Sequence, residues 1–194
     1  MNEHNRTLPE ALSFNDRQCT VLKALGHGKS GDCYLVSMGQ ARCVVVQLDR
    51  DCGDSDSWGK RLAGERRDYR RLVEARIRVP ELIEVDEAHG RLLRAYIPGP
   101  TAFELVRDDG MRPEYLNQVR AMAALAREAG LNLDYLPENF VVYDGQLYYV
   151  EYRCADYRDD ENFDNLGARY WKKTRAFLER LERRRREPGE RGGD

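Results

Sequence analysis

Residues 132–152 read NLDYLPENFVVYDGQLYYVEY, and this stretch decides the fold. It contains an acid, Asp134, and five residues later an amide, Asn139. Asp144-Gly145 then lies between two runs of β-branched and aromatic residues, which is among the strongest local signals for a β-hairpin. Such a hairpin returns the end of its second strand, with Glu151, to the start of its first strand. The three side chains are therefore expected to converge, and their oxygen atoms suit Mg²⁺ or Mn²⁺ better than Zn²⁺.

The N-terminal part of the chain helps to decide whether this hairpin is a site or one of the many acid-rich surface loops. Residues 20–48 predict three strands, at 20–25, 32–37 and 42–48. The first connection carries Gly26, Gly28 and Gly31 in the pattern G-x-G-x-x-G. A dinucleotide-binding fingerprint would open a helix here, whereas residues 32–36 continue as a strand. The motif is therefore either a glycine-rich lid over phosphates or a plain hairpin turn.

Length and composition exclude several classes of protein. The chain has 194 residues, of which 34% are charged, and its net charge of −2 favours neither nucleic acid nor a membrane surface. It contains no apolar run of membrane-spanning length, and its first residues lack the apolar segment of a signal peptide. The five cysteines form no CxxC pair, which indicates reduced thiols rather than disulfides or a zinc site. These features predict a cytoplasmic protein without a membrane partner.

Further elements are predicted from periodicity and turn residues. A helix is expected over residues 60–77, and two strands are expected on either side of a turn at 88–90. An extended segment at 95–97 then ends in Pro98-Gly99-Pro100. Three more helices are expected at 101–107, 113–129 and 162–183. The last of them is expected to bury Phe163, Leu166, Tyr170, Phe177 and Leu181.

In this order the features resemble the landmarks of protein-kinase-like enzymes. The catalytic loop of that family reads H-R-D-x-K-P-x-N and is followed by a short hairpin and D-F-G. Here residues 137–139, PEN, match its end, Asp134 falls on the loop Asp, and Glu151 falls on the metal-binding Asp. The stretch is similar to small bacterial kinase-like proteins that read N-I-D-Y-F-P-x-N-F, then L-Y-Y-I-D-Y, then N-F-x-N-W-G-x-K-Y-W. The landmarks span roughly residues 20–172.

The resemblance implies an α+β, protein-kinase-like fold, related to the small serine/threonine, aminoglycoside and lipopolysaccharide-sugar kinases. A small antiparallel-sheet N-lobe would be followed by a reduced, mainly helical C-lobe. The implied division of the chain is a loose lead-in at 1–17, an N-lobe at 18–97, a C-lobe at 98–183, and a disordered charged tail at 184–194.

The resemblance also implies a site for ATP with Mg²⁺ or Mn²⁺. Asp134 would act as the base toward a substrate hydroxyl, and Asn139 and Glu151 would bind the metal. The nucleotide would be bound by the backbone of two segments: Gly26, Gly28 and Gly31 over the phosphates, and the hinge residues Tyr96 and Ile97 at the adenine.

The third strand departs from the family pattern. It has no lysine for the α- and β-phosphates, since that position falls at Val46, or at Gln47 with a one-residue slip. Glu65 on the following helix thereby loses its expected partner. Lys29 in the Gly-rich segment, or Lys23 on the first strand, could supply the missing charge in catalysis.

Glu151 is a second departure, because it adds a methylene to a ligand of a cation that demands a strict octahedron. The sequence therefore leaves two functions open. The first is an ATP-dependent phosphotransferase acting on an unspecified protein or small-molecule hydroxyl. The alternative is a pseudokinase, a nucleotide-binding or regulatory scaffold without turnover. Nucleic acid is a less favoured partner, because glutamates are interspersed among the arginines of the helices.

Overall fold

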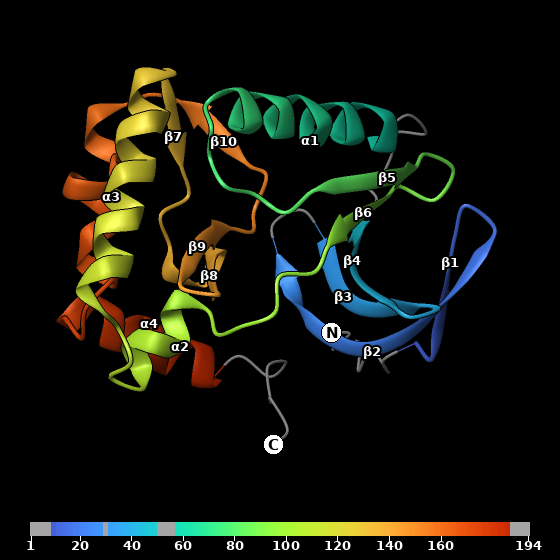
Figure 1. The fold of residues 1–194 in the computed structure, drawn as a ribbon, viewed down its shortest axis with the longest axis horizontal. Coiled ribbons are helices and arrows are strands. Elements are labelled where there is room, and N and C mark those ends of the chain that lie inside the picture. Colours follow the sequence, from blue (N-terminus) through green and yellow to red (C-terminus); the bar gives the residue numbers. More distant parts are fainter. Residues whose placement is uncertain (1–8, 29–30, 50–56, 187–194) are drawn as a thin grey trace. The chain divides into compact units, whose positions relative to one another are not determined.

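The structure is a computed structural model, and it describes residues 9–28, 31–49 and 57–186 (Figure 1). Two compact units are present. The first comprises Met1–Gly64 and Glu81–Tyr96, and the second comprises Glu65–Pro80 and Ile97–Asp194. The predicted division into a lead-in, two lobes and a tail remains a prediction.

The first unit is built on one antiparallel sheet. Its six strands have the order β1-β2-β3-β4-β6-β5. The strands are β1 Ala11–Phe14, β2 Arg17–Gly28, β3 Gly31–Met38, β4 Ala41–Leu48, β5 Leu82–Asp86 and β6 Arg91–Ala95. The predicted strands of residues 20–48 are confirmed and are longer than expected. The two strands around the turn at 88–90 are confirmed as well.

Strand β1 differs from the expectation of a loose N-terminal segment. It pairs with β2 through a turn in which Asn15 and Asp16 have positive φ angles of 44° and 61°. Asparagine and aspartate tolerate this left-handed conformation better than other residues with side chains do. Phe14 is fully buried, so the burial of one aromatic ring holds a strand too short to be recognised from its sequence pattern.

The two faces of the sheet carry different apolar clusters, because successive side chains of a strand point to opposite faces. One face buries Phe14, Cys19, Val21, Val36, Cys43, Val45 and Leu93. The other buries Val46, Leu48 and Leu92 together with Leu62 of helix α1, Ser57–Glu74. Trp58 of α1 packs on this second cluster. We call the face that carries Val46 the α1 face.

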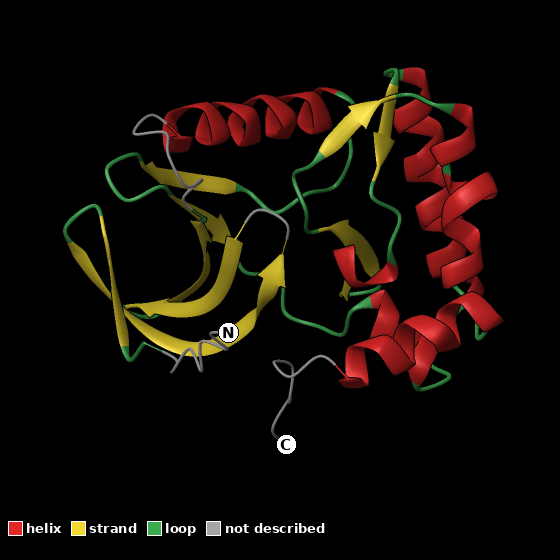
Figure 2. Cartoon of the chain, turned by 180° about the vertical axis from the view of Figure 1, so that it is seen from behind, coloured by secondary structure: helices red, strands yellow, loops and turns green. Residues whose placement is uncertain are grey.

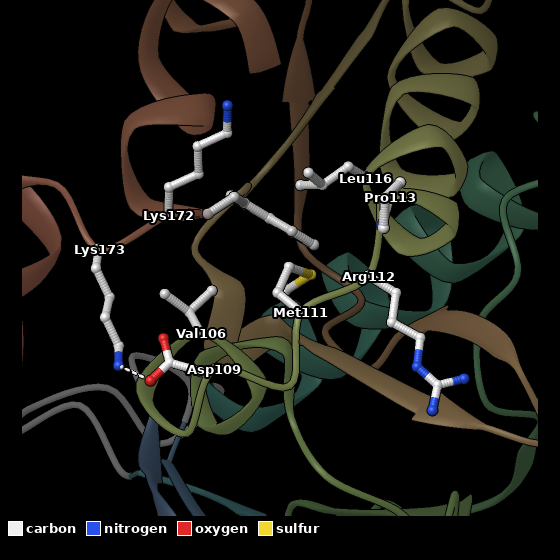
Figure 3. A pocket seen from close by; sticks show the side chains of 9 residues that line it. Val106, Asp109, Met111, Arg112, Pro113, Leu116, Lys172 and Lys173 are labelled. Carbon is white, nitrogen blue, oxygen red and sulfur yellow. Dashed lines mark hydrogen bonds and ion pairs between the residues drawn. The ribbon is translucent and has the colours of Figure 1, made fainter.

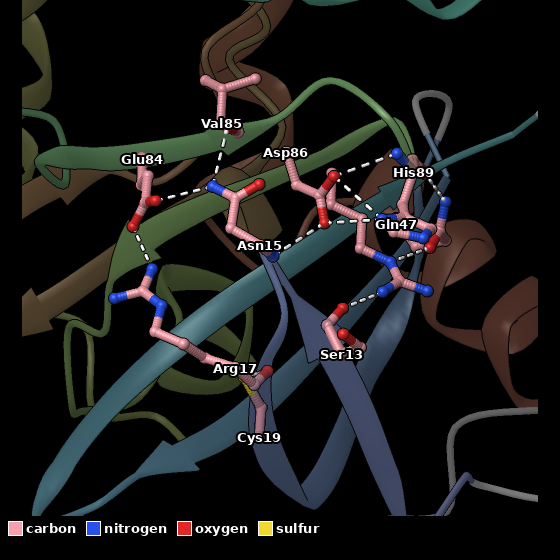
Figure 4. Close-up of polar contacts among 10 residues, drawn as sticks. Ser13, Asn15, Arg17, Cys19, Gln47, Glu84, Val85, Asp86 and His89 are labelled. Carbon is pink, nitrogen blue, oxygen red and sulfur yellow. Dashed lines mark hydrogen bonds and ion pairs between the residues drawn. The ribbon is translucent and has the colours of Figure 1, made fainter.

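A polar network joins the β1–β2 turn to the β5–β6 turn (Figure 4). The carboxylate of Asp86 is 1% exposed and accepts hydrogen bonds from the backbone N–H groups of Asn15 and His89, each at 3.0 Å. His89 Nδ1 lies 2.9 Å from Asp86 Oδ2. Burial raises the pKa of Asp86, but the bonds from Asn15 and His89 stabilise the ionised form, and the net result is a pKa below its usual range.

The second unit is mainly helical, as Figure 2 shows in red. Its helices are α2 Ala102–Arg107, α3 Pro113–Glu128 and α4 Arg175–Arg186. Helix α2 begins with a capping box in which Thr101 and Glu104 bind each other's backbone N–H groups. The short strands are β7 Leu131–Leu133, β8 Phe140–Tyr143, β9 Gln146–Tyr149 and β10 Cys154–Asp156. The first two helices confirm the prediction, and the pairing of β7 with β10 was not predicted.

The predicted single helix at 162–183 is wrong. Residues Phe163–Gly167 form a π-helical turn and Ala168–Tyr170 a 3₁₀ turn, and only from Arg175 does α4 begin. Leu166, expected in the core, is 38% exposed. A Cβ atom on Gly167 would lie 2.6 Å from Tyr135 Cβ, so this turn packs directly on the loop that contains Asp134.

The described residues also bear on two expectations from composition, the state of the cysteines and the absence of a membrane-spanning segment. Cys19, Cys33, Cys43 and Cys154 are free thiols. Within the described segments, no helix combines the length and the apolar character needed to cross a bilayer.

Candidate functional site

The hairpin predicted from Asp144-Gly145 is present. Strands β8 and β9 pair antiparallel from Phe140↔Tyr149 to Tyr143↔Gln146. Asp144 and Gly145 have φ angles of 48° and 70°, as a two-residue hairpin turn requires. Beyond the hairpin, Val150 N–H donates to the carbonyl of Asn139 at 2.9 Å. The residue preceding Glu151 is thus bonded to Asn139, and the second strand returns to the start of the first.

Asp134 and Asn139 lie in the loop between β7 and β8, and both are half-buried. Asn139 Nδ2 donates to the backbone carbonyl of Asp134 at 3.2 Å. This bond fixes the amide so that its Oδ1 faces away from the Asp134 carbonyl. The loop is shaped by the 3₁₀ turn Pro137–Asn139, which Pro137 starts with its fixed φ angle.

Glu151 is half-buried and folds back on its own backbone. Its Oε1 accepts hydrogen bonds from the N–H groups of Tyr152, at 2.9 Å, and Arg153, at 3.4 Å. The side chain, which is one methylene longer than that of aspartate, therefore bends back toward the backbone N–H groups that follow it. Both of these bonds are accepted by Oε1 and neither by Oε2.

Tyr149 connects these groups, although sequence patterns gave no reason to single it out. Its hydroxyl accepts a hydrogen bond from Asp134 N–H at 3.1 Å and donates one to the carbonyl of Arg153 at 2.7 Å. The residue is fully buried. Burial, and then the charge of Glu151, raise the pKa of Tyr149 well above its usual value, so the hydroxyl remains a donor.

Two side chains from the C-terminal segment hold the same loop. Trp171, which is 1% exposed, donates from Nε1 to the carbonyl of Tyr135 at 2.8 Å. Its ring meets Phe140 and Phe163 edge-on, at centroid distances of 5.0 and 5.8 Å. Arg180 of α4 donates from Nε to Glu138 Oε1 at 2.7 Å. Both contacts join residues far apart in sequence, which is why pattern analysis missed them.

The donors of this site fit a hard divalent cation. Asn139, which bonds to the backbone of Asp134, and Glu151, whose neighbour Val150 bonds to Asn139, carry amide and carboxylate oxygens, the donor type that Mg²⁺ and Mn²⁺ prefer. Within the described residues, no group of three or more His, Cys, Asp or Glu side chains is placed to hold a metal. Any such ion would thus depend on an amide oxygen and on water in addition to the acids, as Mg²⁺ commonly does.

Two glycines of the Gly-rich segment have backbone conformations that residues with a Cβ atom rarely adopt. Gly31 has a φ angle of 144°, and a Cβ there would lie 1.9 Å from the backbone oxygen of Gln47. Gly26, at a φ angle of 136°, follows a register shift between β2 and β3. Gly28 pairs with Gly31 across the hairpin. Lys29 lies outside the described residues, so its predicted role stays a prediction.

The third strand of the prediction corresponds to β4, and it has no cation at the expected position, Val46 or Gln47. Val46 is 2% exposed and belongs to the cluster on the α1 face. Gln47 donates from Nε2 to the carbonyl of His89 at 2.9 Å and accepts from Arg91 Nε. Lys23 on β2 is exposed. Glu65 lies on α1 one turn after Leu62 and is half-buried.

The expected hinge residues mark the boundary between the two units. Tyr96 is the last residue of the first unit, Ile97 is the first residue of the second segment of the second unit, and both are half-buried. In the following segment, Gly99 has a φ angle of 145°, and a Cβ there would lie 2.0 Å from the carbonyl oxygen of Val142. Val142 N–H donates to the carbonyl of Pro100 at 3.0 Å, so this segment is bonded to β8.

Comparison with solved structures identifies the fold. The kinase domain of PknI from M. tuberculosis matches with a TM-score of 0.52 and 21% sequence identity. The match covers 75% of this chain and 61% of the PknI chain, so this chain spans about three fifths of that domain. The chain has a protein-kinase-like fold. No protein-family model matches the sequence, and no curated protein matches it.

The kinase-like fold gives the predicted elements a common framework. Its antiparallel N-terminal sheet and helical C-terminal part confirm the α+β fold class. The roles of Asp134, Asn139 and Glu151 are not decided by fold similarity, because one fold supports many functions.

A separate pocket of about 280 Å³ lies in the second unit (Figure 3). Its lining includes Met111, Leu116 and Trp171, and Lys173, which also lines it, binds Asp109 at 2.5 Å. None of the predicted site residues lines it. Its volume is slightly below the range of about 300–1,000 Å³ that is usual for small-molecule sites, so it is not the favoured site.

Proposed function

We propose that the chain is an ATP-dependent phosphotransferase of the protein-kinase-like superfamily. It transfers phosphate to the hydroxyl of a protein or small molecule in the cytoplasm. The proposal includes the division into an N-lobe at residues 18–97 and a C-lobe at 98–183. It combines the kinase-like fold with the arrangement of side chains in the β7–β10 segment.

In this proposal each residue of the segment has one task. Asp134 orients the acceptor hydroxyl and takes its proton, while Asn139 and Glu151 hold Mg²⁺ or Mn²⁺. The metal ion, when bound, neutralises charge on the phosphate oxygens. Tyr149 keeps the Asp134 backbone in place, and the backbone of Gly26, Gly28 and Gly31 covers the phosphates. Tyr96 and Ile97 bind the adenine through their backbone groups.

One observation carries the proposal: the Tyr149 hydroxyl bonds both to Asp134 and to Arg153, two residues after Glu151, while Asn139 bonds to Asp134. Asn139 binds the Asp134 carbonyl, and the Tyr149 hydroxyl binds both Asp134 N–H and the carbonyl of Arg153. Phosphoryl transfer depends chiefly on positioning and on neutralising charge, and a loop fixed at both ends supplies positioning. An ordinary surface turn has no need of a buried tyrosine hydroxyl for this purpose.

The test is transfer of the γ-phosphate from radiolabelled ATP to the protein itself and to pools of proteins and hydroxyl-bearing small molecules. Asp134→Asn is expected to reduce transfer by about 10²- to 10⁴-fold, the usual contribution of a positioned base. Asp164→Asn is the matched control, because Asp164 is an exposed acid in the same unit. Equal transfer by Asp134→Asn and the unaltered protein would rule out this role for Asp134.

The alternative is a pseudokinase, and the burial of Val46 favours it. A buried valine in an apolar cluster stands where a kinase presents a lysine to the phosphates. A nucleotide-binding scaffold does not transfer phosphate, so it does not need this lysine. Thermal stabilisation by Mg-ATP together with absence of transfer would favour the scaffold over the enzyme. Absence of any nucleotide effect would contradict both.

A nucleic-acid partner is not favoured. Several arginines of α4 are engaged within the protein: Arg180 and Arg184 approach Glu138, and Arg175 binds Glu179 at 2.7 Å. Charges neutralised in this way contribute little to the release of counterions on which such binding depends.

A further inference from the structure

The pocket of the second unit is a cavity that the proposed function leaves unused. It lies where the end of α2, the connection to α3 and residues 171–173 meet (Figure 3). Its volume of about 280 Å³ corresponds to roughly nine water molecules at about 30 Å³ each. A compact organic molecule with about that number of non-hydrogen atoms therefore fits into it.

The buried part of the pocket lining is apolar. Val106 and Trp171 are 3% and 1% exposed, and Met111 and Leu116, which also line the pocket, are half-buried. The one polar atom of the indole, Nε1, already donates to the carbonyl of Tyr135 at 2.8 Å, so Trp171 offers the pocket only apolar surface. Such a lining favours an apolar group over water, which finds few hydrogen-bond partners there.

The exposed part of the lining is positively charged. Arg112, Lys172 and Lys173 contribute three cations against one acid, Asp109. That acid is bound by Lys173 at 2.5 Å. Arg112 lies over the ring of Tyr115, at 6.0 Å from its centroid, and neither it nor Lys172 has an ion pair in the described part of the chain. Two cations of the pocket are thus without a counter-charge.

We propose that this pocket binds a small organic anion, in which a short apolar body ends in a carboxylate. The body packs on Leu116, Met111 and the ring of Trp171, and the carboxylate pairs with the two cations that lack a counter-charge. In Figure 3, Lys172 and Arg112 lie on opposite sides of the apolar side chains, and the long stem of each allows its charged end to turn toward an anion. The site is separate from the proposed nucleotide site.

The experiment uses hexanoate as the probe and follows the indole N–H signals by ¹H–¹⁵N NMR. Trp171 lines the pocket, whereas Trp58 packs in the first unit, and Trp58→Phe assigns the two signals. Hexanoate is expected to shift the Trp171 signal saturably and to leave the Trp58 signal in place. A dissociation constant of about 1 mM is expected for a ligand of about eight non-hydrogen atoms.

Two relatives of the probe separate its two parts. Acetate keeps the charge without the chain, and it is expected to bind at least about 30-fold more weakly, since each buried methylene contributes roughly fourfold. Hexanol keeps the chain without the charge, and it is expected to bind about three- to tenfold more weakly. Added salt is expected to weaken the binding of hexanoate and not that of hexanol.

Variants then assign the charged groups. Lys172→Met and Arg112→Met together are expected to reduce the affinity for hexanoate to that for hexanol. Arg127→Met is the matched control: it removes an exposed arginine of α3 that does not line the pocket, and both affinities should stay unchanged. Leu116→Trp fills the apolar part of the pocket and is expected to weaken both ligands at least about tenfold.

The ligand series on the unaltered protein decides the matter even if a variant does not fold. The inference is overturned if hexanoate leaves the Trp171 signal in place, if it shifts both indole signals equally, or if hexanol binds as tightly as hexanoate. A Trp171 signal that moves with protein concentration in the absence of hexanoate overturns it as well, because a second copy of the chain would then cover the pocket. No nucleotide enters these measurements, so their outcome leaves the proposed function untouched.

Discussion

Arg180 on α4 binds Glu138 in the middle of the loop that runs from Asp134 to Asn139. The Nε atom of Arg180 donates to Glu138 Oε1 at 2.7 Å, and Arg184 approaches the same oxygen at 3.6 Å. Glu138 is 18% exposed, and its Oε2 is buried without a hydrogen-bond partner among the described residues. The Glu138 carboxylate is thus paired with two arginines of α4, so this helix is part of the support of the loop.

The first prediction concerns this ion pair. Arg180→Met keeps most of the side-chain volume and leaves Glu138 with less compensation, so the free energy of unfolding should fall by about 1–2 kcal/mol. Arg175→Met is the control, because Arg175 is 92% exposed and an exposed ion pair contributes about 0–1 kcal/mol. Urea denaturation measures both. Equal losses in the two variants would show that α4 does not hold the loop through Arg180.

A second prediction concerns the hydroxyl of Tyr149. Tyr149→Phe leaves Asp134 N–H and the carbonyl of Arg153 without their partner in a buried place. Each unsatisfied group costs about 1–3 kcal/mol, so a loss of stability in that range or above is expected. Tyr143→Phe removes a hydroxyl from a residue that is 46% exposed and should change stability by less than about 0.5 kcal/mol. Chemical denaturation followed by circular dichroism provides the comparison, and indistinguishable variants would contradict the role of Tyr149.

Asp86 provides a prediction of pH dependence. Because its pKa is lowered in the folded protein, its stabilisation is complete above the ordinary aspartate value of about 4 and is lost as the pH falls through the lower, folded-state pKa. Asp86→Asn introduces an NH₂ group among N–H donors and should cost about 1–3 kcal/mol at pH 7. The difference between the variant and the unaltered protein should then narrow below about pH 4.

Unfolding in urea at a series of pH values from 7 to 3 measures this difference. Asp160→Asn, which changes an exposed acid, is the control and should show no such trend. A difference that stays constant down to pH 3 would mean that the ionised carboxylate of Asp86 is not what stabilises the network.

The fourth prediction separates structure from ligand binding in the Gly-rich motif. Gly31→Ala forces a Cβ against the backbone of Gln47 at a positive φ angle, and it should cost at least about 3 kcal/mol without any nucleotide present. Gly39→Ala is the matched control: Gly39 also has a positive φ angle, of 62°, but a Cβ there has open space. It should cost only about 1–2 kcal/mol. Thermal denaturation compares the two, and similar melting temperatures would contradict the packing argument.

Local signals in the sequence were sufficient for much of the fold. Asp144-Gly145 determined the hairpin because the turn needs two positive φ angles, which these residues tolerate. The helix predicted at 101–107 is present as α2, and its start is stabilised by Thr101 and Glu104, whose side chains bind backbone groups within one turn. Interactions of this kind act between residues close in sequence, so their pattern is visible without a structure.

The remaining features depend on contacts between distant residues. The segment after Asn162 has a helical pattern, but close packing of Gly167 on Tyr135 and the bond from Trp171 to the Tyr135 carbonyl favour a π-helical turn over a regular helix. Likewise, the role of Tyr149 follows from the two backbone groups that the fold places beside its hydroxyl. For the candidate site, the sequence therefore proposed Asp134, Asn139 and Glu151, and the structure added the residues that hold their loop.

The position of Trp171 makes it an intrinsic fluorescent probe of the candidate site. The sequence has two tryptophans, and they are divided between the units: Trp58 packs in the first and Trp171 in the second. Indole fluorescence after Trp58→Phe would come from a single ring hydrogen-bonded to the loop that contains Asp134. Emission from that ring reports when water reaches this loop. Emission from Trp58 alone reports when water reaches the sheet. The unfolding of each unit can thus be followed by the fluorescence of its own tryptophan.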